Sequence, residues 1–190
     1  MEVARFEDIQ AEFMRRAQQA VYCSVATIDL HNRPRSRIMH VIWDGPTGWV
    51  ITRPGSPKTR HLAQNPHASL AYIGDPQRPM YIESVAAWED EATEEQRIWD
   101  LHRSTPPPLG FDPAPHYGTT RHPLFGLLRF RPWRIELAEL GQASLIWRPR
   151  SAAPASAAGG REAETGVNSL PQQGLADRLG RDPGRAEKGA

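Results

Sequence analysis

The chain has 190 residues, 39% hydrophobic and 24% charged, which is long enough for one domain with a buried core. Its formal net charge of +1 excludes the strongly basic field that drives non-specific nucleic-acid binding. A single cysteine, Cys23, excludes an internal disulfide framework, and no apolar run approaches the roughly 20 residues of a membrane span, so we expect a cytoplasmic protein without a signal peptide.

An amphipathic helix opens the chain, because apolar residues recur at helical spacing from Phe6 to Ala17 through Ile9, Phe13 and Met14. A capping box formed by Thr93 and Gln96 predicts a further helix that ends near residue 102. Short strands at close spacing with few helices favour an antiparallel barrel or sandwich. We expect strands at 21–30, 35–43, 48–53, 68–73, 80–88, 125–130 and 133–138, and a short helix at 58–64.

The last part of the chain differs in composition from the rest. Residues 151–190 contain no aromatic residue and are rich in Ala, Gly, Ser, Pro and Arg, so they cannot bury enough apolar surface to offset the entropy of ordering. We therefore expect a folded domain at 1–145 and a disordered tail at 146–190, with only a marginal helix at 175–179.

The segment 105–118 is too rich in proline for regular structure. It either packs on the barrel as a surface loop or forms a lid whose aromatic residues, Phe111 and Tyr117, stack on a planar ligand.

No catalytic constellation is present in the sequence. The seven histidines lack metal-ligand spacing, and neither a Gly-x-Ser-x-Gly elbow nor a phosphate-binding Walker loop occurs. Cys23 lies in an apolar strand, where a buried and inert thiol is expected. We predict no nucleophile, no acid–base residue and no metal site.

Lys58 is unusual because the chain has only one other lysine, Lys188, against 21 arginines. It follows Pro57, which favours a first helical position, so Lys58 falls in the first turn of a helix, where free N–H groups attract anions. Arg35 and Arg37 lie two apart and would project from one face of a strand. Two interpretations remain open: a surface lysine among solvated arginines, or a site for a bound anion.

Residues 35–73, with "RSRIMHVIWDG" followed by "WVITRPGSPKTRHLAQNPHASLAYI", resemble the flavin-binding core of the pyridoxamine 5′-phosphate oxidase-like family. The Ser-x-Lys to Asn-Pro segment is the most specific part, and the resemblance extends over most of residues 5–140 through "RPMYIESVAAWEDE" and "RPWRIELAEL". It implies a mainly β fold with a few helices: a split β-barrel of the FMN-binding type, with six or more antiparallel strands.

The resemblance also implies a cofactor site and a homodimer with FMN at the subunit interface. Arg35 and Lys58 would pair with the FMN phosphate, and Ser56 and Thr59 would add donors. The flavin would run alongside the strand at 35–43 and contact the end of the next one. The residues implied to bind the cofactor are Arg35, Arg37, Ile38, Met39, Ile51, Thr52, Ser56, Lys58 and Thr59.

Departures from the family pattern leave the reaction open. His40 stands where many members have Lys, Pro57 stands where the oxidases have Arg, and Pro79 occupies a flavin-contacting Gln position. The C-terminal substrate-binding segment of the vitamin B6 oxidases has no match, since "RIEL" is followed by Ala138.

Three functions follow from this resemblance. The first is an FMN-dependent oxidoreductase acting on a small molecule by hydride transfer through flavin N5. The second is a reductase that uses the deazaflavin F420, with Arg33, Arg53 and Arg60 meeting its longer anionic tail. The third is a flavin or haem binder without catalysis.

Overall fold

The computed structural model describes residues 1–149 and confirms a mainly β fold with a few helices. The predicted tail beyond residue 149, with its marginal helix, lies outside the described residues. The strands are β1 Glu2–Val3, β2 Tyr22–Ile28, β3 Pro34–His40, β4 Ile42–Asp44, β5 Thr47–Ile51, β6 His67–Tyr72, β7 Met80–Glu89, β8 Leu127–Leu137 and β9 Leu145–Trp147. The helices are α1 Glu7–Ala20, α2 Pro57–Gln64, α3 Ala92–Ser104 and α4 Ala114–Tyr117.

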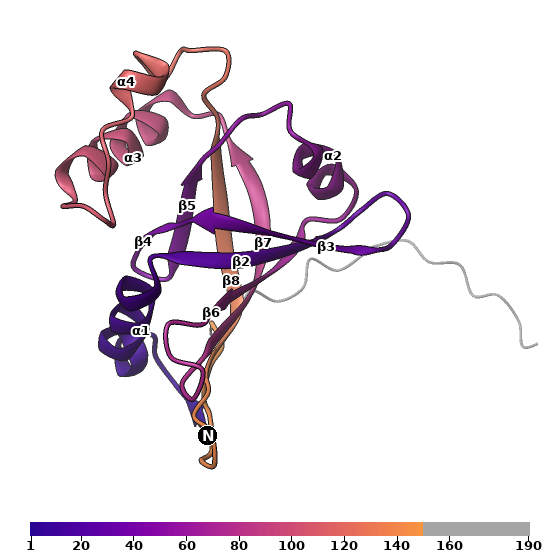
Figure 1. Ribbon diagram of the computed structural model, residues 1–190, viewed down its shortest axis with the longest axis vertical. Coiled ribbons are helices and arrows are strands. Elements are labelled where there is room, and N and C mark those ends of the chain that lie inside the picture. The colour runs from indigo at the N-terminus through magenta and orange to yellow at the C-terminus, as the bar shows by residue number, and fades with distance from the viewer. Residues whose placement is uncertain (150–190) are drawn as a thin grey trace, which may run out of the picture. The chain divides into compact units, whose positions relative to one another are not determined.

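The longest strand, β8, lies at the branch point of the sheet (Figure 1). One edge of β8 pairs with β7, and the other edge is shared by β5, which pairs with residues 127–130, and β9, which pairs with residues 135–137. The remaining order runs β7-β6-β2-β3, so that β3 is an edge strand within the described part of the chain. All of these pairs are antiparallel, and the one parallel pair, β1 with β9, ties the N-terminus to the end of the described chain.

Helix α1 fills the main core with the apolar face that the sequence predicts. Ile9, Phe13 and Ala17 are buried on this face. The Phe13 ring meets Trp43 edge to face at 4.9 Å between centroids, and the Trp43 indole N–H donates to the Tyr72 hydroxyl at 2.8 Å. The polar atoms of these large side chains are therefore satisfied inside the core.

A second apolar cluster attaches α3 and the following loop to the sheet. Ile98 and Trp99 of α3 pack with Trp49, Phe125 and Leu127. The cap of α3 differs from the prediction, because the Glu91 side chain, not Thr93, accepts the Glu94 N–H. A carboxylate at this position also complements the helix dipole.

Two predicted strand boundaries are wrong, each for a local reason. The strand predicted at 35–43 breaks at Val41, since β3 pairs with β2 whereas β4 turns away to pair with β5. Conversely, the two strands predicted at 125–130 and 133–138 are one strand, β8, in which Pro132 lies at a register shift opposite residues 83 and 84 of β7. A bulge accommodates a proline that cannot donate to the ladder.

Two further predictions need correction at the ends of the domain and in the loop. The segment 105–118 contains a short helix, α4, despite its prolines. Strand β9 carries the sheet past the predicted boundary at residue 145, and Trp147 packs edge to face on Phe6 at 5.4 Å between centroids.

None of the helices within residues 1–149 is long and apolar enough to cross a membrane.

Candidate functional site

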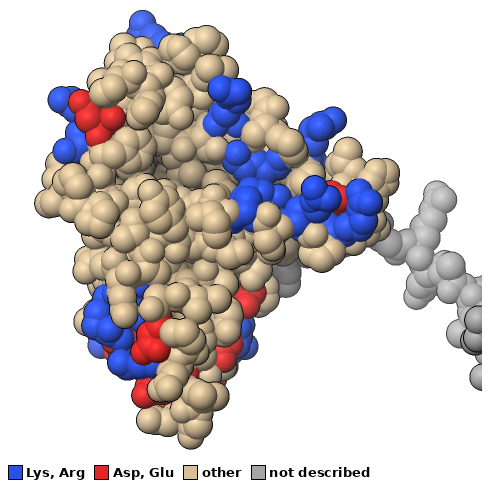
Figure 2. Space-filling model, viewed as in Figure 1, with Lys and Arg blue, Asp and Glu red and all other residues tan. Residues whose placement is uncertain are grey.

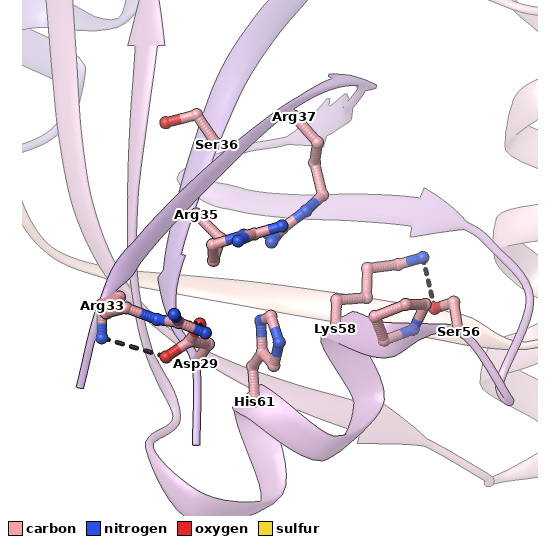
Figure 3. A pocket seen from close by; sticks show the side chains of 9 residues that line it. Asp29, Arg33, Arg35, Ser36, Arg37, Ser56, Lys58 and His61 are labelled. Carbon is pink, nitrogen blue, oxygen red and sulfur yellow. Dashed lines mark hydrogen bonds and ion pairs between the residues drawn. The ribbon is translucent and has the colours of Figure 1, made fainter. Parts of the chain in front are cut away.

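The edge strand β3 carries the two predicted arginines toward α2. Arg35 lies opposite Thr27, and Arg37 lies opposite Val25 of β2. Because side chains alternate along a strand, both arginines share the face of the sheet on which Val25 is buried. Figure 3 shows Arg35 and Arg37 pointing into a pocket, whereas Ser36 points away.

The turn that leads into β3 is held by a buried carboxylate. Asp29 accepts the backbone N–H groups of His31 and Arg33 and pairs with the Arg33 guanidinium at 3.0 Å. Burial opposes ionisation of Asp29, but the hydrogen bonds from Arg33 and from the His31 backbone hold its pKa below the usual range. Arg33 therefore lines the pocket with its positive charge balanced by the Asp29 carboxylate.

Lys58 lies in the first turn of α2, as the sequence predicts, with Ser56 as N-cap and Pro57 as the first helical residue. Its ammonium donates to the Ser56 hydroxyl at 2.7 Å. The Thr59 hydroxyl turns back to donate to the Pro54 carbonyl, and the Thr59 N–H bonds the Ser56 carbonyl. Thr59 therefore stabilises the turn and does not line the cavity.

These elements enclose a cavity of about 390 Å³ between β3 and α2, over which lysine and arginine side chains gather (Figures 2 and 3). Within the described chain, Arg35, Arg37 and Lys58 form no salt bridge with a carboxylate. The cavity is lined by Asp29, Arg33, Arg35, Ser36, Arg37, Ser56, Pro57, Lys58 and His61.

The clustered cations raise the free energy of one another. Burial and the nearby charge of Arg37 lower the pKa of Lys58, and burial together with Arg35 lowers the pKa of Arg37. A bound anion would reverse both effects, because each cation would gain an opposite charge. The cavity is thus suited to a group that carries more than one negative charge.

A second cavity of about 330 Å³ adjoins the first, since Arg37 and Lys58 line both. Beyond these two cations its walls are mainly apolar. They are formed by Ile38, Met39, His40, Val50, Ile51, Thr52 and Phe111. Together the two cavities offer a cationic end and an apolar end to one elongated ligand.

Close packing beneath Thr52 holds the end of β5 in place. The Thr52 N–H donates to the Gly126 carbonyl at 2.8 Å. A Cβ on Gly126 would lie 2.6 Å from the Pro54 ring and 2.9 Å from the Thr52 carbonyl. Only glycine lets β8 approach the segment that leads into the Lys58 turn.

Eight of the nine predicted site residues line one cavity or the other, and Thr59 is the exception. The prediction missed Asp29 and His61 in the first cavity, and it named Arg33 only for the longer tail of F420. A signal for His61 existed, because it follows Lys58 by three residues and so shares its helix face. Of the cations considered for a longer tail, Arg33 lines the first cavity and Arg60 lines a neighbouring one of about 220 Å³, whereas Arg53 lines none of these.

The loop after α3 contributes one aromatic residue to the apolar cavity. Phe111 lines it and packs on His102 and His40, at 4.7 and 6.0 Å between ring centroids. Tyr117, the other candidate for stacking on a ligand, packs edge to face on Phe125 instead. Of the two aromatic residues considered in this loop, only Phe111 lines the apolar cavity.

The buried position of His102 predicts that the stability of the fold depends on pH. It is 1% exposed, neither ring nitrogen has a hydrogen-bond partner among the described residues, and burial, with a smaller effect of His40, lowers its pKa to about 4. The unfolded chain, with an ordinary histidine pKa near 6.5, binds more protons between these values, so stability is lost as the pH falls from about 6.5 to 4, by up to roughly 3 kcal/mol.

This loss should disappear in His102→Phe, which keeps a ring but cannot titrate. Urea unfolding of both proteins between pH 7 and 4.5 should show the wild type losing about 2–3 kcal/mol more than the variant. Parallel pH profiles would show that His102 is protonated as easily in the folded as in the unfolded chain.

Comparison with known proteins places the fold. A Clostridium acetobutylicum protein related to general stress protein 26 of B. subtilis has a TM-score of 0.60 at 13% identity, covering 75% of this chain and 95% of its own. An FMN-binding, pyridoxamine 5′-phosphate oxidase-related protein from Nostoc punctiforme has a TM-score of 0.56 at 18% identity, with 75% and 88% covered. A heme binding protein from Mycobacterium smegmatis has a TM-score of 0.56 at 17% identity, with 77% and 60% covered.

At these identities the structural likeness shows the fold alone, which is the split β-barrel expected from the sequence. No curated protein matches the sequence significantly. The sequence pattern of the family described as pyridoxamine 5′-phosphate oxidase matches residues 9–106, just over half of the chain. On this match and on the fold, the chain belongs to the pyridoxamine 5′-phosphate oxidase family.

Proposed function

We propose that the chain binds FMN across the two adjoining cavities and acts as a flavin-dependent oxidoreductase on a small molecule. The observation that carries this proposal is that a cationic cavity and a mainly apolar cavity adjoin at Arg37 and Lys58, which line both. A cationic cavity suits a phosphate dianion, and an apolar cavity next to it suits a planar ring system. The structural relative from Nostoc, which binds FMN, supports the choice of ligand.

The residues present fit both ends of FMN. Arg35, Arg37 and Lys58 would bind the phosphate, because they offer charge-assisted donors and none of them forms a salt bridge within residues 1–149, where Asp29 pairs with Arg33 instead. Ile38 of the edge strand β3 also lines the apolar cavity, next to Arg37. Met39 and Phe111 would close the apolar end.

The chain's part in the reaction is positioning and exclusion of water. Bound FMN would supply the redox chemistry, with N5 as the atom that exchanges a hydride. Besides Arg37 and Lys58, His40 is the titratable residue that lines the apolar cavity. Burial lowers the pKa of His40, and a hydrogen bond with the Leu109 backbone has a smaller, opposite effect. With His40 neutral, the only charges at the apolar cavity would be those of Arg37 and Lys58, at the end where it meets the first cavity.

A second candidate ligand is the deazaflavin F420, favoured by the number of cations. Three positive charges that have no carboxylate partner in the described part of the chain exceed the two negative charges of one phosphate, and Arg60 lines the neighbouring cavity together with His61. A longer anionic tail could use this surplus. The likeness to the heme binding protein keeps haem as a further alternative.

We also propose a homodimer that covers the outer face of the sheet beside the cavities. In the pairing register Ile38, Ser24, Ala71 and Tyr81 lie side by side across four strands. Ile38 and Tyr81 are exposed, as is Trp133 at the bulge of β8. A second copy would bury this apolar surface, and light scattering after gel filtration should give the mass of two chains; the mass of one chain would contradict the dimer.

The ligand is tested by parallel titration of the ligand-free protein with FMN, F420 and haem. We expect the fluorescence of FMN to fall on binding, with a dissociation constant in the micromolar range or below. A micromolar constant corresponds to a binding free energy of roughly −8 kcal/mol. Tighter binding of F420 would keep the site but change the ligand. A Soret band with haem and no response to FMN would refute the flavin proposal.

A further inference from the structure

His61 lies inside the cationic cavity although it belongs to no expected set of binding residues. It follows Lys58 by one helical turn on α2, so both side chains face the cavity. Figure 3 shows the His61 ring between Lys58 and the Asp29–Arg33 pair, below Arg35 and Arg37. Any anion held by Arg35 and Lys58 would therefore meet this ring.

A chain of hydrogen bonds fixes the orientation of the ring. Arg37 Nη2 donates to the Thr27 hydroxyl at 2.9 Å, and the same hydroxyl lies 3.1 Å from His61 Nδ1. A guanidinium has no acceptor, so the hydroxyl accepts from Arg37, and toward Nδ1 it can either donate its own hydrogen or accept an N–H. When it donates to Nδ1, neutral His61 carries its proton on Nε2 and keeps that N–H available for a ligand.

Thr27 makes this arrangement rigid. It is 2% exposed and lies one residue before the end of the paired register between β2 and β3, so the strand pairing fixes the position of its side chain. The bond to Thr27 thereby orients the His61 ring before any ligand arrives.

The charges around His61 are mainly positive in the ligand-free site. Burial, Arg37, Arg35 and Arg60 lower the pKa of His61, whereas Asp29 raises it; Lys58 and Arg33 line the same cavity. A phosphate dianion beside the ring would oppose the cations and favour the imidazolium form.

We propose that His61 is a binding residue for the terminal phosphate of the ligand, donating from Nε2, and that it takes up one proton from solvent at Nδ1 when the phosphate binds. The inference rests on the proposed phosphate site. On proton uptake the new Nδ1–H would donate to the Thr27 hydroxyl, which has one lone pair for Arg37 and one for His61. The hydrogen of the hydroxyl would then rotate away from Nδ1. No other bond changes.

Calorimetric titration with FMN in buffers of different ionisation enthalpy tests the proton count. At pH 7.0 the phosphate is already mostly a dianion, since its second pKa is about 6, so uptake reports the protein. We expect the wild type to take up roughly half a proton or more, and His61→Gln, which keeps an N–H donor but cannot titrate, to take up none. The FMN affinity of His61→Gln should be on the order of tenfold lower at pH 6.5, and the difference should shrink toward pH 8.5.

His116→Gln, an exposed histidine on α4, serves as the matched control and should behave like the wild type. Equal affinity and equal proton uptake in the wild type and His61→Gln would overturn this inference and leave the FMN site standing. Absence of FMN binding to the wild type would overturn both.

Discussion

Replacing Lys58 with methionine is expected to weaken FMN binding by roughly ten- to a hundredfold, the effect of losing one charge-assisted hydrogen bond. Lys58 lines both cavities, so its ammonium would meet the ligand where the phosphate joins the ring-bearing part. Methionine keeps most of the apolar stem and removes the charge. Fluorescence titration of the variant with FMN measures the loss.

The same substitution should not destabilise the ligand-free protein. The pKa of Lys58 is lowered by burial and by Arg37, which means that the surroundings disfavour its charge before an anion arrives. Urea unfolding should therefore give Lys58→Met a free energy of unfolding equal to or above that of the wild type. A loss of both stability and affinity would instead indicate that the lysine supports the fold.

Arg53→Met is the matched control, because Arg53 is exposed and lines neither cavity although it lies five residues before Lys58. Its FMN affinity should stay within about twofold of the wild type, as expected for a charge at that distance in water. An equal loss in both variants would show that general positive charge, not the cavity, attracts the ligand.

Replacing Arg16 with methionine is expected to lower the free energy of unfolding by about 3 kcal/mol. Arg16 is a buried guanidinium, 6% exposed, on the inner face of α1. Its Nη1 donates to the carbonyls of Arg78, Pro79 and Ala138 at 2.7–3.1 Å, and its Nε pairs with Glu12 at 2.6 Å. Methionine would fill the space but leave the carbonyls of Arg78 and Ala138 without the Arg16 donor, whereas the Pro79 carbonyl keeps the N–H of Ala138.

Arg15→Met provides the comparison for this prediction. Arg15 pairs with the same Glu12, but its side chain is 48% exposed and it bonds no backbone carbonyl among the described residues. Its removal should change stability by less than about 0.5 kcal/mol. Similar losses for both variants in urea unfolding would mean that the ion pair with Glu12, and not the carbonyl contacts, stabilises this junction.

The sequence predicts those parts of the fold whose signals are local. The apolar spacing of α1 and the Pro57-Lys58 start of α2 both depend on neighbouring residues, and both are found in the structure. The short strands β1 and β9 are different, since Glu2 pairs with Ile146 and neither segment has enough residues to show a period. Only the folded chain brings these two segments together.

The site could be predicted as a set of residues but not as a network. The two-residue spacing of Arg35 and Arg37 places them on one face, and the cavity contains both. The bond between Thr27 and His61 joins a strand to a helix 34 residues later, and no periodicity encodes such a contact. Asp29 was missed for a local reason. An acidic residue beside a turn commonly accepts hydrogen bonds from the backbone of that turn, and Asp29 does so here from His31 and Arg33.

The central claim is that the cationic cavity binds the phosphate of a flavin. The most direct test compares FMN with riboflavin, which has the same ring and ribityl chain but no phosphate, on the wild-type protein at one ionic strength. We predict that FMN binds at least about a hundredfold more tightly, since three cations that form no salt bridge among the described residues would contact the phosphate. Equal affinities, or no binding of either compound, would contradict the claim.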